Sequence, residues 1–193
     1  EECHSRGMAV ILDVVYNHAF GQSPLALLYW DGAQNRPAAN NPWLNPIPKH
    51  DFNVGNDFNH ESPATKYFVK RVISWWMQTY GIDGFRFDLA SGFTQRNSLG
   101  NFNEWARYDT SRINNIQEYA DLMWSIDPES YVILENFVDN SERKEVSSRG
   151  MMLWGNMSIE YGQASKGFGG SDLGGSWWEH VGWGEPGLIA YME

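Results

Sequence analysis

Three segments, VILD at residues 10–13, GFRFD at residues 84–88 and YVILE at residues 131–135, decide the fold of this 193-residue chain. Each contains a run of apolar residues and ends in a carboxylate. Short apolar runs are typical of strands that are buried on both faces of a parallel sheet. In a parallel α/β barrel, the carboxyl ends of the strands gather functional side chains at one mouth of the sheet. The pattern therefore predicts an enzyme with several acids at that edge.

The segments between these runs predict helices. Ser62 and Pro63 are typical of a helix start, and apolar residues then recur at helical spacing until Gly81, which is typical of a helix end. The expected helices span residues 63–80, 113–126 and 141–148, and the expected strands span residues 8–15, 82–89, 131–134, 151–154 and 188–192. Residues 1–7 are typical of the end of a helix that stops at a glycine. Strands that alternate with helices predict an α/β fold with a parallel sheet.

Residues 19–60 interrupt this alternation with a long segment that has no sustained period. A loop of this length inside a compact domain is usually functional or disordered. Its aromatic residues favour an ordered, functional loop: Tyr29, Trp30, Trp43, Phe52 and Phe58.

Composition excludes several classes of partner. The formal net charge is −10, with 14 Lys and Arg against 24 Asp and Glu. Nucleic acids and anionic membranes attract clustered basic residues, so we expect neither as a partner. The sequence contains no apolar run of transmembrane length. Cys3 is the single cysteine, which excludes an internal disulfide framework.

In chain order, DVVYNH at residues 13–18, GFRFD at residues 84–88 and Glu135 resemble the first three signature regions of the α-amylase family, glycoside hydrolase family 13. The resemblance implies a (β/α)8 TIM barrel, of which residues 1–193 would cover about strands three to seven. It also implies that residues 19–60 are a domain-B-like insertion after the third strand. The family's fourth region, with the third catalytic Asp, is expected beyond residue 193. We therefore expect the fragment 1–193 to be inactive on its own.

Asp88 resembles the family's catalytic nucleophile. Retaining glycosidases need two carboxyl groups about 5 to 5.5 Å apart, one as nucleophile and one as acid. Arg86 precedes Asp88 by two residues, so both side chains lie on one side of the strand, where the cation should keep the carboxylate ionised. A purely structural ion pair is the alternative interpretation.

Glu135 resembles the family's general acid. It follows Val132, Ile133 and Leu134, so apolar surroundings should raise its pKa, as a proton donor requires. Asn136 and Asp139 follow Glu135 and either line the cleft or face water.

The first motif supplies three further candidates by resemblance. His18 resembles the histidine that hydrogen-bonds the sugar, and Asp13 resembles the acid that supports the arginine of the site, here Arg86. Asn17 corresponds to a position that ligates a structural calcium ion in many members, although calcium needs six to eight oxygen ligands. Asp57 is a second candidate ligand, with a solvated loop aspartate as the favoured interpretation. The chemistry itself needs no cofactor. His50, His60 and His180 receive no role.

Residues 89–92 read LASG, where many α-amylases carry a Lys-His pair that contacts sugar on the leaving-group side. This difference leaves linkage and chain-length preference open. The leading hypothesis is a hydrolase of α-linked glucans such as starch, glycogen or maltooligosaccharides, working by double displacement. A glucanotransferase or branching enzyme with the same residues is the nearest alternative. A non-catalytic carbohydrate-binding descendant is a third, which the intact Arg86, Asp88 and Glu135 argue against. For localisation, a secreted or periplasmic protein is favoured over a cytoplasmic one.

Overall fold

The centre of the computed structural model is a four-stranded sheet, and the structure describes residues 1–53, 55–154, 162 and 165–167. The strand order is β1 (Ile11–Val14), β6 (Gly84–Phe87), β7 (Tyr131–Glu135) and β8 (Met152–Trp154). All three pairings are parallel, so every connection must cross from one end of the sheet to the other. The predicted parallel α/β sheet is confirmed.

The register of the sheet brings the predicted acids to one level. Phe87 pairs with Leu134, so Asp88 and Glu135, the residues that follow them in sequence, lie side by side at the ends of β6 and β7. Asp13 pairs with Arg86 on the other side of β6. The residues that end the three apolar runs therefore lie at a common edge, as the sequence predicted.

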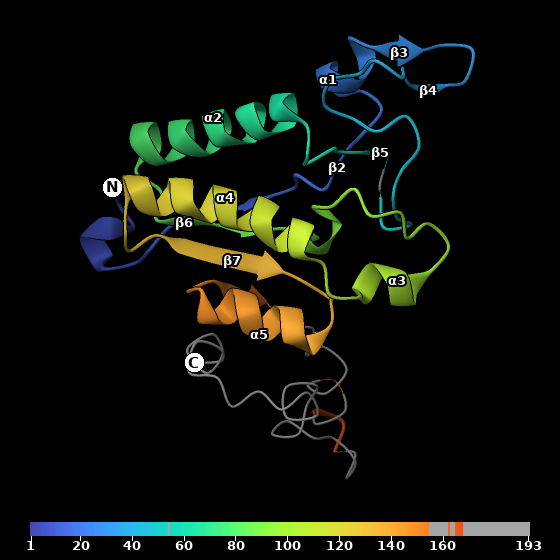
Figure 1. Cartoon of the computed structure of the whole chain (residues 1–193). Helices are drawn as coiled ribbons and strands as arrows, with labels where there is room; N and C mark the ends of the chain where they lie inside the picture. Colours follow the sequence, from blue (N-terminus) through green and yellow to red (C-terminus); the bar gives the residue numbers. More distant parts are fainter. Residues whose placement is uncertain (54, 155–161, 163–164, 168–193) are drawn as a thin grey trace.

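Three longer helices cover the sheet (Figure 1): α2 (Pro63–Tyr80), α4 (Thr110–Ile126) and α5 (Asn140–Ser148). The Oγ of Ser62 accepts a hydrogen bond from the Ala64 N–H at the start of α2, and Gly81 ends that helix with a φ of 60°. Helices α2 and α4 pack side by side. Within the described residues, no helix is both long enough and apolar enough to cross a membrane.

The main core lies between these helices and the sheet. Val69 and Ile73 of α2, Ile113 of α4 and Phe85 of β6 are all completely buried in it. The apolar positions that predicted the helices are thus the ones that pack on the strands.

The remaining elements are short: η1 (His4–Arg6), β2 (His18–Ala19), α1 (Pro24–Leu27), β3 (Trp30–Asp31), β4 (Arg36–Pro37), β5 (Asn56–Asp57), η2 (Ala90–Gly92) and α3 (Phe102–Ala106). Strand β2 pairs with β5 and β3 pairs with β4, both antiparallel and outside the main sheet. Figure 1 shows α1, β3 and β4 together beyond one end of α2. Residues 19–53 and 55–60 therefore contain short regular elements, as the interpretation of an ordered loop expected, and the assignment of residues 19–60 as a domain-B-like insertion stays a prediction.

Two expectations about the strands need comment. The strand expected at residues 8–15 is shorter, and its burial on both faces was wrong, because Met8 and Val15 are half exposed and the Asp13 side chain is 66% exposed. The reason is that β1 forms an edge of the described sheet, with β6 as its one described neighbour. The strand expected at residues 188–192 lies outside the described residues. Helix α3 was not predicted.

Candidate active site

The Arg86 guanidinium joins three carboxylates that come from three neighbouring strands. Its Nη1 lies 2.9 Å from Asp13 Oδ1 and 2.8 Å from Asp88 Oδ1. Its Nη2 lies 3.1 Å from Glu135 Oε2. The Arg86, Glu135 and Asp88 side chains are 15%, 12% and 25% exposed, so water screens their contacts less than it screens the contact with Asp13, which is 66% exposed. The structure thus brings together four of the residues that the sequence predicted for the site.

Arg86 supplies the positive charge that offsets the repulsion between these carboxylates. Burial by itself would lower the pKa of Arg86, but the hydrogen bonds to Asp13 and Asp88 and the charge of Glu135 raise it above its ordinary value. The guanidinium is therefore positively charged, as arginine side chains in proteins are. This arrangement places a cation directly beside the Asp88 carboxyl group, as the sequence predicted for a nucleophile.

Glu135 has the electrostatic surroundings of a proton donor. Burial is the main cause that raises its pKa, and the neighbouring Asp88 raises it further through its charge and a hydrogen bond. The backbone N–H of Leu89 and the charge of Arg86 act in the opposite direction. The direction of the pKa shift agrees with the prediction from the apolar strand.

Two contacts of the site were missed by sequence reasoning. The Leu89 N–H donates a hydrogen bond to Glu135 Oε2 over 3.0 Å. The ring of Trp154, which pairs with Glu135 across the sheet, stacks on Arg86 with 4.7 Å between the guanidinium carbon and the ring centroid. The sequence did contain a signal for Trp154, because it is an aromatic residue at the end of the strand expected at residues 151–154.

His18 is held at the start of the loop by Asn17. The Asn17 Nδ2 donates hydrogen bonds to His18 Nδ1 over 2.9 Å and to the carbonyl of Phe52 over 2.8 Å. Because Nδ1 accepts, the ring proton of neutral His18 sits on Nε2. Burial lowers the pKa of His18, while the charge of Asp88 raises it. His18 is thus placed as a neutral donor within the electrostatic reach of Asp88.

The predicted calcium position contains three buried polar groups. Asn17 Oδ1, His50 Nε2 and Asp57 Oδ1 have no hydrogen-bond partner among the described residues, and the last two lie 3.5 Å apart. The interpretation of Asp57 as a solvated aspartate was wrong, because the pairing of β5 with β2 buries it completely. Two oxygens and an imidazole nitrogen fall short of the six to eight oxygens that calcium prefers. No group of three or more His, Cys, Asp or Glu side chains that could hold a metal ion occurs in the described part of the chain. Calcium at Asn17 stays a prediction.

Asn136 and Asp139, which follow Glu135, lie in different surroundings. Asn136 is buried, so it does not face water, and its Nδ2 lies 3.5 Å from Glu142 Oε1. Asp139 is exposed and caps α5 by accepting a hydrogen bond from the Ser141 N–H. Neither residue shows a contact with Asp88.

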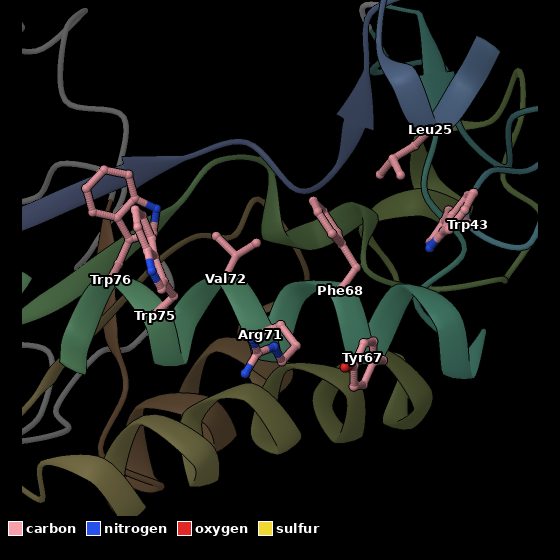
Figure 2. Close-up of a pocket in the computed structure, with 8 residues that line it drawn as sticks. All are labelled: Leu25, Trp43, Tyr67, Phe68, Arg71, Val72, Trp75 and Trp76. Carbon is pink, nitrogen blue, oxygen red and sulfur yellow. The ribbon is translucent and has the colours of Figure 1, made fainter. Parts of the chain in front are cut away.

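An open groove of about 610 Å³ lies elsewhere, along α2 (Figure 2). Val72 and Trp76 point from α2 towards this groove, and Leu25 and Trp43 approach it from the loop. It contains none of the acids at the strand ends. The groove is therefore distinct from the candidate active site.

Comparison with known proteins supports the family resemblance that the motifs indicated. No family model matches the chain. The isoamylase SU1 of Zea mays is 37% identical over 103 residues, which are 51% of this chain and 12% of the relative. The 1,4-alpha-glucan-branching enzyme of Equus caballus is 30% identical over 137 residues, 70% of this chain and 18% of the relative. The chain therefore spans less than a fifth of the length of either relative.

The fold has a counterpart among solved structures. Amy13B of Eubacterium rectale superposes with a TM-score of 0.62 at 18% identity, over 88% of this chain and 36% of that protein. At this identity the likeness concerns the fold alone. Together with the ordered motifs and the relatives, it leads to one assignment: the chain belongs to the α-amylase family, glycoside hydrolase family 13, and its sheet is part of that family's (β/α)8 barrel.

Proposed function

We propose that the whole protein is a retaining glycoside hydrolase that acts on α-linked glucans by double displacement. The observation that carries this proposal is the placement of Asp88 and Glu135 on one guanidinium, that of Arg86, at the ends of adjacent strands. Asp88 attacks the anomeric carbon while Glu135 donates its proton to the departing glycosidic oxygen. In the second step, the Glu135 carboxylate takes a proton from water, whose oxygen attacks the anomeric carbon and releases Asp88.

The closeness of the two acids supports retention over inversion. Inverting enzymes keep their carboxyl groups about 6.5 to 9.5 Å apart to leave room for a water molecule, whereas retaining enzymes hold them about 5 to 5.5 Å apart. Asp88 and Glu135 bind the same guanidinium, Asp88 through Nη1 and Glu135 through Nη2 of Arg86. Two acids that share one guanidinium at the ends of adjacent strands support the close spacing of a retaining enzyme, in which Asp88 is the nucleophile.

The substrate class is supported by the motifs and by the relatives. One relative is a 1,4-alpha-glucan-branching enzyme by name, and another is an isoamylase. Glucan transfer is therefore the second candidate function, in which a sugar hydroxyl replaces water in the second step. Both functions use Asp88 and Glu135 in the same roles, so the products distinguish them.

The test is an assay of the whole protein on soluble starch and maltoheptaose, alongside Asp88→Asn and Glu135→Gln. Asp121→Asn is the matched control, because Asp121 is an exposed carboxylate on α4. We expect the control to keep full activity and Glu135→Gln to lose about 10²- to 10⁴-fold in rate. Asp88→Asn should lose at least as much. Reducing-sugar release would support hydrolysis, and longer or branched products without it would support transfer. Equal activity of Asp88→Asn and Asp121→Asn would contradict both.

A further inference from the structure

We propose that Leu89 is a positioning residue whose backbone N–H, presented in a left-handed conformation directly after Asp88, holds the Glu135 carboxyl group for proton transfer. The inference rests on the proposed function, in which Glu135 is the general acid. It assigns a role to a residue whose apolar side chain carries no catalytic chemistry.

The conformation of Leu89 is unusual. Its φ is 45° and its ψ is 46°, and the one other described non-glycine residue with a positive φ is Asn35. Asparagine adopts this region readily, whereas a leucine there meets a steric penalty. Such strain persists only where the surrounding structure enforces it, and it is concentrated at functional sites.

The turn that follows Leu89 enforces this conformation. The Gly92 N–H donates to the Leu89 carbonyl over 2.9 Å, and the Arg112 Nη1 donates to the Ser91 carbonyl over 3.0 Å. Ala90, Ser91 and Gly92 are all buried. The turn η2 is therefore anchored in the protein interior, and the Leu89 N–H faces Glu135 Oε2 at 3.0 Å as a result.

The Leu89 N–H offsets part of the rise that burial causes in the pKa of Glu135. Among the described residues, the polar and charged groups that face Glu135 are the Leu89 N–H, Arg86 and Asp88. Burial and Asp88 raise the pKa of Glu135, whereas the N–H and Arg86 lower it. An acid that must first donate a proton and then accept one works best with a pKa near the working pH. Without the N–H, the pKa of Glu135 would rise and the return step would suffer.

The test compares Leu89→Val with Leu89→Gly in the whole protein. A β-branched residue avoids positive φ strongly, so valine should turn the N–H away from Glu135, whereas glycine adopts the conformation freely. The pKa of Glu135 is measured by NMR titration of ¹³C-labelled glutamate carboxyl groups, with Glu135→Gln to assign the signal. We expect valine to raise this pKa by about one pH unit, and glycine to leave it unchanged. The alkaline limb of the kcat profile should move up with it.

The outcomes separate the alternatives. An unchanged Glu135 pKa in a folded Leu89→Val protein would overturn the proposal and leave Leu89 with a structural role only. If Leu89→Val does not fold, Leu89→Ala takes its place, with a smaller rise expected and no rise as the contradicting result. The NMR titration needs no turnover, so a wild-type protein without activity on glucans would refute the proposed function while the pKa comparison still decides the role of Leu89.

Discussion

Arg112 and Glu142 form a two-point ion pair that is completely buried beneath the loops of the candidate active site. Arg112 Nε lies 2.7 Å from Glu142 Oε1, and Nη2 lies 2.5 Å from Oε2. The remaining guanidinium N–H groups donate to three carbonyls, those of Ser91, Trp105 and Arg107. The pair therefore ties the loop after Asp88, the segment before α4 and the start of α5 to one another.

Breaking the Arg112–Glu142 ion pair should lower the stability of the folded protein. Arg112→Met leaves the Glu142 charge buried without a counterion, so we expect the free energy of unfolding to fall by about 3 to 5 kcal/mol. The double variant Arg112→Met/Glu142→Leu removes both charges and should lose less than the two single variants combined. Urea denaturation measures all three. Arg149→Met, which breaks the partly exposed ion pair between Glu145 of α5 and Arg149 directly after that helix, is the control and should cost about 0.2 to 1 kcal/mol. Additive losses in the double variant would contradict this account.

Gly92 should tolerate no side chain. A Cβ at this position would lie 1.7 Å from Asn17 Oδ1 and 2.6 Å from His50 Nε2, so one of these buried groups would have to move. We expect Gly92→Ala to destabilise the protein by about 1 to 3 kcal/mol and to reduce activity, because Asn17 holds His18. Thermal and urea unfolding check the first expectation.

Gly32→Ala is the control for Gly92→Ala. A Cβ at Gly32 would meet nothing within 4 Å, so this variant should stay within about 0.5 kcal/mol of the wild type. A Gly92→Ala protein as stable as Gly32→Ala would refute the close packing of Asn17 and His50 under the loop after Asp88.

Glu135 should make the folded protein less stable as the pH rises. Because its folded-state pKa is raised above the ordinary value of 4.5, mainly by burial, its favourable contribution is complete below the unfolded-state pKa. That contribution is lost as the pH rises through the folded-state pKa. Glu135→Gln cannot titrate, so its free energy of unfolding should improve relative to the wild type between pH 4 and pH 7. Urea unfolding at a series of pH values measures the difference. A difference that is constant across this range would show that the pKa of Glu135 is not raised.

The fold was predictable because its signals are local. Ser62 and Gly81 bound α2 as the sequence indicated, and the apolar runs at residues 84–87 and 131–135 became neighbouring strands. The grouping of Asp13, Arg86, Asp88 and Glu135 followed from the rule that parallel strands end at the same edge. The catalytic roles came from the resemblance to a family, because an apolar strand that ends in an acid does not by itself specify chemistry.

Other features depend on tertiary contacts that no local pattern encodes. His60 is completely buried, with its ring nitrogens 2.9 Å from the Tyr119 hydroxyl and 2.7 Å from the Tyr16 carbonyl. Burial lowers its pKa to about 4, which keeps it neutral as a structural residue. The burial of Asp57 and the left-handed conformation of Leu89 likewise arise from segments distant in the sequence.

The central claim is that Asp88 is the nucleophile, and trapping the covalent intermediate tests it most directly. The whole protein is incubated with a 5-fluoro-α-glucosyl fluoride, which slows the second step, and is then digested with a protease and examined by mass spectrometry. The account predicts one fluoroglucosyl group, attached to Asp88 in the peptide that contains residues 84–88, and no label in Asp88→Asn. Turnover of glucans with a label on another residue, or with inversion of the anomeric configuration, would contradict it.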